Sequence, residues 1–254
     1  MPRIVQTVSE WKALREEFRA AGKTIGFVPT MGALHPGHGS LFEAAGRACD
    51  VVLASLFVNP TQFDEAHDFQ NYPRVLDQDC ALMDRTGVDV VFAPSVGEMY
   101  PNGTTYSVAE SDLSRSLCGA HRPGHFSGML TVVLKLLQIG DAEQAFFGEK
   151  DYQQLMLIRG MCEAFFLTTK IVGCPTIREA DGLAMSSRNT RLSPAERSLA
   201  PRFHEALVSA ESADQVRTRL AAAGFAVDYI EDRDQRRFGA VRLGQTRLID
   251  NVAR

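Results

Sequence analysis

The chain is short of cysteine and of excess charge, and it has no long apolar run; each shortage excludes a class of protein. Its 254 residues include five cysteines, an odd number without a Cys-x-x-Cys pair, which argues against a disulfide framework or a structural zinc site. The net charge of -4 offers no basic surface for nucleic acid. No apolar run approaches the roughly 20 residues of a membrane span, and the N-terminus lacks the features of a secretion signal. We therefore expect a cytoplasmic protein that binds neither nucleic acid nor membranes.

The composition is that of a folded protein, and the balance of acidic and basic residues differs between two parts of the chain. Hydrophobic residues make up 45% and charged residues 23%, enough apolar material for a sizeable core. At about 150 residues per domain, the length predicts one large domain or two unequal ones. Residues 177–254 carry 13 basic residues, all arginine, against 11 acidic ones, whereas the preceding part is acidic. We place the boundary there, with one domain over 1–176 and a small one over 177–254.

Strand-like and helix-like segments alternate along residues 1–176, which predicts an α/β fold: a parallel sheet with helices on both faces. The expected strands are 24–28, stopped by Pro29, then 51–58, 88–93, 145–147 and 168–172. The expected helices are 9–21, capped by Ser9, then 38–49, 75–86, 126–139 and 152–164. Residues 177–254 predict a small α+β unit with helices over 194–209 and 213–224 and strands over 226–230, 240–243 and 247–249. A hairpin turn at Gly244-Gln245 joins the last two strands.

The segment 29–38, Pro-Thr-Met-Gly-Ala-Leu-His-Pro-Gly-His, follows a strand and enters a helix, where parallel sheets bind ligands. His35 and His38 are three residues apart and should project to one side. Gly32 and Gly37 permit close approach of a ligand, and the helix start offers free N–H groups to an anion. One histidine alone would most simply be a structural residue, but the cluster favours a phosphate site. Nothing nearby completes a zinc ligand set.

Two further segments carry phosphate-binding chemistry. In 185–189, Met-Ser-Ser-Arg-Asn, two hydroxyls stand beside Arg188, a forked donor. In 148–154, Lys150 is one of only five lysines, and Asp151 could start a helix or contact a ribose. Alone, the first is also a common surface loop and the second an ordinary charged helix start.

Amide and acidic side chains follow other strands. Asn59 and Gln62, in the segment 57–63, offer uncharged donors and acceptors suited to a small hydroxy acid, although a plain Asn-Pro turn explains the segment equally well. Beyond 72–74, Asp79 could bind Mg²⁺ or could simply face solvent on a helix. The fingerprints of P-loop, dinucleotide-binding, α/β-hydrolase and cysteine-protease sites are missing from the sequence.

Taken together, these segments resemble the pantothenate synthetase family (pantoate–β-alanine ligase, AMP-forming), of the HxGH nucleotidylyltransferase superfamily. The resemblance covers nearly the whole chain. The segments that carry it are 27–38, 57–63, 72–74, 122–126, 147–152, 185–189 and 243–251.

The resemblance implies a Rossmann-like domain with a C-terminal lid, and a two-step reaction that uses ATP and Mg²⁺. The carboxylate of (R)-pantoate would attack the α-phosphorus of ATP, and the amine of β-alanine would then attack the pantoyl-adenylate. The run 231–237 stands where the family generally has a longer segment, so we expect a shortened lid. The family also implies a homodimer.

The resemblance also assigns residues. His38, His35, Lys150 and Arg188 would be catalytic. Gln62, Gln154 and Asn59 would bind pantoate, Gln62 would bind β-alanine as well, and Asp79 is the candidate for Mg²⁺. The residues that would bind ATP are Met31, Gly32, Ala33, Leu34, His35, Pro36, Gly37, His38, Gly148, Glu149, Lys150, Asp151, Ile177, Met185, Ser186, Ser187 and Arg188.

Two other functions are compatible with parts of the sequence. A nucleotidylyltransferase would make a stable dinucleotide-like product, and the amide-bearing segments around Gln62 and Gln154 argue against it. A non-catalytic nucleotide binder would have no need of His35, His38, Lys150 and the 186–188 turn together.

Overall fold

The computed structural model describes residues 1–62, 72–73 and 75–254. Phe63 and Arg74, which belong to two of the predicted motifs, lie outside the described residues.

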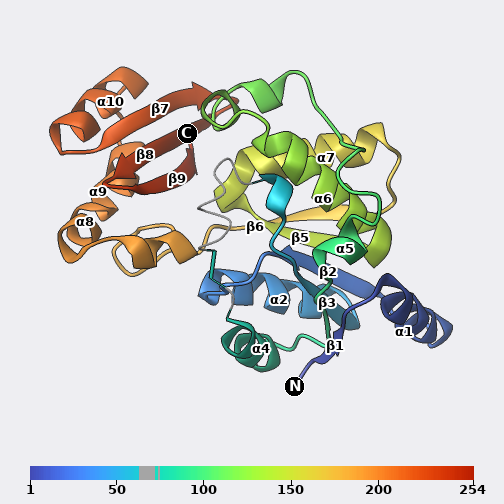
Figure 1. The fold of residues 1–254 in the computed structure, drawn as a ribbon. Helices are drawn as coiled ribbons and strands as arrows, with labels where there is room; N and C mark the ends of the chain where they lie inside the picture. The colour runs from blue at the N-terminus through green and yellow to red at the C-terminus, as the bar shows by residue number, and fades with distance from the viewer. Residues whose placement is uncertain (63–71, 74) are drawn as a thin grey trace.

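Six parallel strands form the main sheet in the order β1-β4-β3-β2-β5-β6 (Figure 1). Their bounds are β1 Arg3–Val5, β2 Ile25–Thr30, β3 Val51–Leu56, β4 Val90–Phe92, β5 Gln144–Gly148 and β6 Lys170–Cys174. The chain adds β3 and β4 on one side of β2, then β5 and β6 on the other. At such a switch point, the loops at the carboxyl ends of neighbouring strands part and leave a crevice. The loops after β2 and β5 therefore frame the position expected for a ligand.

Helices cover both faces of this sheet, as the alternating pattern predicts. On one face, α2 Pro36–Ala48 and α4 Leu76–Arg85 pack with a core that includes Phe42 and Met83. On the other face lie α1 Val8–Ala20, α6 His125–Gly140 and α7 Tyr152–Ala164, with Trp11 at the centre of a larger core. A short helix, α5 Val96–Met99, and the turns η2 Leu113–Arg115 and η3 Gly119–His121 complete this part.

The last third of the chain builds a separate antiparallel sheet, β7-β8-β9, drawn in red in Figure 1. Its strands are β7 Ala226–Arg233, β8 Arg236–Leu243 and β9 Thr246–Ala253. The helices α8 Pro194–Leu199, α9 Pro201–Leu207 and α10 Ala213–Ala222 accompany it, and Phe203, Val216 and Val241 contribute to a core of its own. Within the described part of the chain, no helix is long and apolar enough to cross a membrane.

Three details differ from the sequence-based expectations at prolines and at a cap. Pro29 does not stop β2, because β2 pairs with β5 only at Gly26 and Phe27, so no ladder partner needs the missing N–H. The helix expected over 194–209 is two helices, since Pro201 begins a new one as its first residue. Helix α1 is capped by Thr7 in a reciprocal capping box with Glu10, and not by Ser9.

Strand lengths account for the other differences. Strand β1, with only three residues, was not expected at all. Strand β3 ends at Leu56, and β6 lies two residues later than expected. The run 231–237 continues β7 and β8 around a two-residue turn at Asp234 and Gln235, with φ of 49° and 59°. The Gly244-Gln245 turn between β8 and β9 is present as expected.

Candidate active site

Two adjoining cavities lie where the main sheet meets the C-terminal sheet. The first, here called the histidine cavity, has a volume of about 240 Å³ and contains His35 and His38 in its wall. The second, the outer cavity, measures about 710 Å³ and is lined from both sheets. The two cavities share five lining residues and therefore adjoin: Lys150, Asp151, Gln154, Ser186 and Arg188. The predicted residues that line the histidine cavity are Met31, His35, Gly37, His38, Gln62, Gly148, Lys150, Asp151, Gln154, Ile177, Met185, Ser186, Ser187 and Arg188.

Seven predicted site residues line neither of these two cavities: Gly32, Ala33, Leu34, Pro36, Asn59, Asp79 and Glu149. The contacts of several of these residues are with the segments that form the cavity wall, and not with the cavity itself.

The two histidines begin helix α2 in an unusual capping box. His35 is the N-cap, and its Nδ1 accepts the N–H of Gly37 at 3.2 Å. His38 reciprocates, because its Nδ1 accepts the N–H of His35 at 3.3 Å. The ring of His35 lies so close to Gly37 that a Cβ there would sit 2.9 Å from its Cε1 atom. A larger residue at position 37 would therefore displace the ring of His35.

This capping changes the expected mode of anion binding. Pro36 has no N–H, Gly37 donates to His35 Nδ1, and the N–H groups of His38 and Gly39 donate to the carbonyl of His35. The first turn of α2 thus has no free amide for a phosphate, contrary to the expectation from sequence. The cap uses the Nδ1 lone pairs, so in each neutral ring the proton is on Nε2 and donation is left to that atom.

Both rings are neutral at physiological pH. Burial, with a contribution from Lys150, lowers the pKa of His35 from its ordinary 6.5 to about 4. Burial and then the neighbouring His35 lower the pKa of His38 to about 3. Two neutral N–H donors in a partly buried cavity can stabilise negative charge that develops on a phosphate oxygen.

Asp79 fastens the loop that leads to the histidines. Its Oδ2 accepts the N–H of Ala33 at 3.0 Å and its Oδ1 the N–H of Leu34 at 2.8 Å, and the side chain is 3% exposed. Ala33 and Gly32 both have positive φ, so the loop needs this support. The described residues contain no group of three or more His, Cys, Asp or Glu side chains able to hold a metal ion. Both oxygens of Asp79 already accept backbone N–H groups, and the magnesium site at Asp79 stays a prediction.

Asn59, predicted to bind pantoate, lines neither cavity, and its side-chain contacts are to the protein itself. It is fully buried; its Nδ2 donates to Gln62 Oε1 and to the carbonyl of Gly128, both at 3.2 Å. Its Oδ1 accepts the Tyr100 hydroxyl at 2.8 Å. Every polar atom of Asn59 is occupied, so its contribution is to hold the carboxamide of Gln62, which does line the histidine cavity.

Cations and an acid meet where the two cavities join. Lys150 Nζ lies 3.6 Å from Asp151 Oδ2, and the Lys150 side chain is 18% exposed. Burial opposes ionisation of Asp151, but Lys150 and Arg188 outweigh it and hold the pKa of this carboxyl below its usual value. Arg188 lies in the turn η5 Ser187–Arg191, whose start is capped by the Ser186 hydroxyl. The site therefore presents two fixed positive charges beside the imidazoles.

The opposite wall of the histidine cavity is apolar. Helix α6 contributes Met129, Val132, Val133 and Leu136, all buried, and β3 is followed by Phe57. Such a wall suits the branched hydrocarbon part of a small molecule, and Gln62 and Gln154 at its margin suit the polar groups.

Sequence reasoning assigned no role to Asp250 and Asn251, although it noted the segment that contains them. Both are buried polar residues of β9, and Asn251 bonds the backbone beside Lys150. Nothing local to the sequence signals this, because the contact joins residues about a hundred positions apart.

Imidazoles, a lysine and a serine–arginine turn gather at the switch point of an open parallel sheet, which defines a nucleotide-binding α/β protein. A profile of the family described as pantoate-beta-alanine ligase matches residues 3–253. The chain belongs to this family.

Known proteins similar to the chain cover it almost completely. It is 49% identical over 252 residues to the pantothenate synthetase of Bdellovibrio bacteriovorus, covering 99% of each chain. It is 46% identical to that of Legionella pneumophila, covering 98% of each. The crystal structure of pantoate-beta-alanine ligase from Francisella tularensis, complexed with beta-gamma ATP and beta-alanine, aligns with a TM-score of 0.94 at 41% identity, covering 100% of this chain and 98% of that one.

Proposed function

We propose that the protein condenses pantoate with β-alanine to pantothenate at the expense of ATP, through a pantoyl-adenylate. A carboxylate oxygen of pantoate forms a bond to the α-phosphorus, and the bond from that phosphorus to the pyrophosphate oxygen breaks. The amine of β-alanine then attacks the activated carbonyl carbon; AMP leaves with the C–O bond electrons, and the amine loses a proton. Family membership and the near-complete coverage of its relatives support this reaction.

The observation that carries the proposal is the pairing of charge-stabilising groups with an apolar wall in one cavity. His35 and His38, whose Nε2–H groups are left free by the cap, line one space together with the cationic residues Lys150 and Arg188. The first step needs in-line geometry and neutralisation of a departing pyrophosphate, with little covalent chemistry from the protein. We assign these four side chains to the triphosphate, with help from the hydroxyls of Ser186 and Ser187.

His38 acts in this scheme as a hydrogen-bond donor and not as a charged acid. With a pKa of about 3, its ring holds no extra proton at neutral pH. Pyrophosphate can leave without taking a proton, so a neutral donor whose bond strengthens as charge develops is sufficient.

We assign pantoate to the space between Gln62, Gln154 and the apolar wall of α6, and β-alanine to the side of Gln62. The adenine end of ATP would then lie toward Ile177, and the ribose toward Gly148 and Asp151. Mg²⁺ enters with ATP as part of the substrate, since the described residues offer it no ligand cluster.

We further propose that residues 177–254 act as a lid over the 1–176 domain. The segment that carries Met185 to Arg188 runs between the two sheets and lines both cavities, so its movement would cover the phosphates (Figure 1). Exclusion of water would protect the acyl-adenylate from hydrolysis. A homodimer in the cytoplasm remains our expectation from the family resemblance.

The test is direct. Purified protein is mixed with ATP, Mg²⁺, (R)-pantoate and β-alanine, and AMP is measured. AMP formation that depends on both pantoate and β-alanine is expected, and its absence would overturn the proposal. A stable adenylylated product in place of free AMP would indicate a nucleotidylyltransferase.

A further inference from the structure

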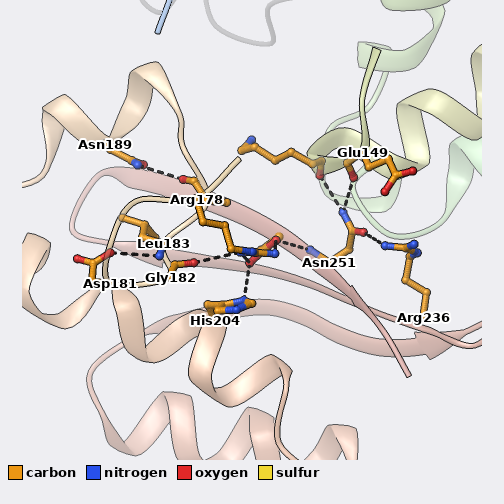
Figure 2. Close-up of polar contacts among 12 residues, drawn as sticks. Glu149, Arg178, Asp181, Gly182, Leu183, Asn189, His204, Arg236 and Asn251 are labelled. Atoms are coloured by element: carbon orange, nitrogen blue, oxygen red, sulfur yellow. Dashed lines mark hydrogen bonds and ion pairs between the residues drawn. The ribbon is translucent and has the colours of Figure 1, made fainter. Parts of the chain in front are cut away.

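Asn251, near the end of the last strand, reaches across to the segment that carries Lys150. Its side-chain Nδ2 donates to two successive carbonyls of the turn η4 Glu149–Asp151, those of Glu149 at 2.8 Å and Lys150 at 2.9 Å (Figure 2). The residue is 4% exposed. A residue of the C-terminal sheet therefore holds the backbone of Lys150, in the turn that follows β5 of the main sheet.

The partners of Asn251 leave its side chain a single orientation. Its Oδ1 accepts from Arg236 Nη1 at 2.5 Å, and a guanidinium can only donate. The two backbone carbonyls of η4 can only accept, so the NH₂ group must face them. Arg236 also lies over the ring of Tyr152, 4.0 Å from its centroid, which holds the guanidinium in place.

The neighbouring Asp250 fastens the second phosphate-binding segment. Its carboxylate receives Arg178 through two bonds of 2.6 and 3.0 Å and lies 3.2 Å from His204 Nδ1. Arg178 in turn donates to the carbonyl of Gly182 and pairs with Ala184, directly before the 185–188 segment (Figure 2). Two successive residues of β9 thus bond the lysine turn directly and, through Arg178, the residues that precede the serine–arginine turn.

We propose that Asn251 is a positioning residue for Lys150, holding its backbone so that the ammonium group meets the triphosphate; this rests on the proposed function. Lys150 has a flexible four-carbon stem, and its Nζ is correctly placed only if its Cα is. Loss of the two donors would leave two carbonyls of η4 without these partners and would let the turn shift. A displacement near 1 Å at a reacting centre lowers a rate by up to about a hundredfold.

The main variant is Asn251→Asp, which keeps the acceptor for Arg236 but replaces the donating NH₂ group by an oxygen that repels both carbonyls. Asn251→Ala is the second variant, because it removes the donor without adding charge. The control is Asp232→Asn, which weakens the ion pair between Asp232 and the buried Arg237 in the same sheet, away from both cavities.

The two half-reactions are measured separately. Pantoate-dependent exchange of pyrophosphate into ATP reports the first step, in which Lys150 acts. Reaction of supplied pantoyl-adenylate with β-alanine reports the second. We expect both Asn251 variants to lower kcat for exchange about ten- to a hundredfold, with the second step and the control within about twofold of wild type.

A double-mutant cycle with Lys150→Ala distinguishes positioning from general destabilisation. If Asn251 acts through the ammonium group, Asn251→Asp changes the residual exchange of Lys150→Ala by less than about twofold. An equal loss in both backgrounds, an equal loss in both half-reactions, or normal exchange in both Asn251 variants would each overturn the positioning role. Absence of exchange in the wild-type protein would instead overturn the proposed function itself.

Discussion

The Nδ1 atom of His38 accepts the backbone N–H of His35, and the two imidazole rings lie 4.2 Å apart between centroids. One contact therefore begins a helix and sets the tautomer of a predicted catalytic ring. The same groups that stabilise the fold locally determine which atom can donate to a ligand.

Replacement of His38 by alanine should reduce the rate of adenylate formation far more than the affinity for ATP. We expect kcat for pantoate-dependent exchange to fall about a hundred- to a thousandfold, because the Nε2–H bond strengthens in the transition state. The KM for ATP should change by less than about threefold. Steady-state exchange kinetics measure both, with Gln138→Ala, on an exposed position of α6, as control. A rise in the KM for ATP alone would contradict the role assigned to His38.

The low pKa values of His35 and His38 predict that kcat does not fall near pH 6.5, where an ordinary histidine would become protonated. With the pKa values of His35 and His38 at about 4 and 3, protonation of these rings should not reduce kcat between pH 8 and about pH 5.5. A kcat profile that falls with a midpoint near the ordinary histidine value of about 6.5 would show that the rings are not held neutral.

The same shifts predict a pH dependence of stability. Between about pH 4 and 6.5 the unfolded chain binds more protons than the folded one, so the free energy of unfolding falls as the pH drops below about 6.5 and is constant above it. His38→Gln should lose less stability than wild type between pH 7.5 and 5 in urea titrations. An equal loss in His38→Gln and wild type would contradict the prediction.

Gln62→Ala should impair the use of pantoate and spare ATP. Gln62 lines the histidine cavity and is held by Asn59, so its loss should raise the KM for pantoate about tenfold, the cost of one hydrogen bond of roughly 1.4 kcal/mol. The KM for ATP should remain within about twofold. Gln138→Ala, on an exposed position of α6, serves as control. Comparable losses for ATP and pantoate would count against the assignment.

The substitution Asp79→Asn distinguishes two roles for Asp79: holding the loop before His35 and binding Mg²⁺. One of the two loop N–H groups would then face an NH₂ group, and we expect a loss of about 1–3 kcal/mol in the free energy of unfolding. The Mg²⁺ concentration that gives half-maximal activity should stay within about twofold of wild type. Asp77→Asn, exposed on the same helix, is the control. A tenfold higher Mg²⁺ requirement in Asp79→Asn alone would restore Asp79 as a metal ligand.

The layered fold could be predicted because its strands and helices appear in the sequence as alternating apolar segments. The details that differed from prediction depend on contacts with residues distant in the sequence. Pro29 is tolerated in β2 because the pairing between β2 and β5 ends at Phe27, although β5 itself continues to Gly148. Strand β1 is visible only through its pairing with β4, since three residues carry no periodicity.

In the candidate active site, too, the sequence indicated the residues that gather but not the contacts between distant segments. Sequence placed His35, His38, Lys150 and Arg188 near one another, and the structure brings them to the wall of one cavity. The sequence could not separate residues that face the cavity from those behind it. Asn59 and Asp79 have the chemistry of ligand-binding groups, yet their polar atoms bond the protein itself.

The capping box of α2 also bears on which ions the site can attract. Two neighbouring imidazoles in a cavity would ordinarily chelate zinc, copper or nickel. Here the Nδ1 lone pairs are committed to backbone N–H groups and each Nε2 carries a hydrogen, so neither ring has a free electron pair to give. A transition metal could bind the pair only after breaking the start of the helix. The capping box of α2 therefore disfavours coordination of a transition metal by His35 and His38.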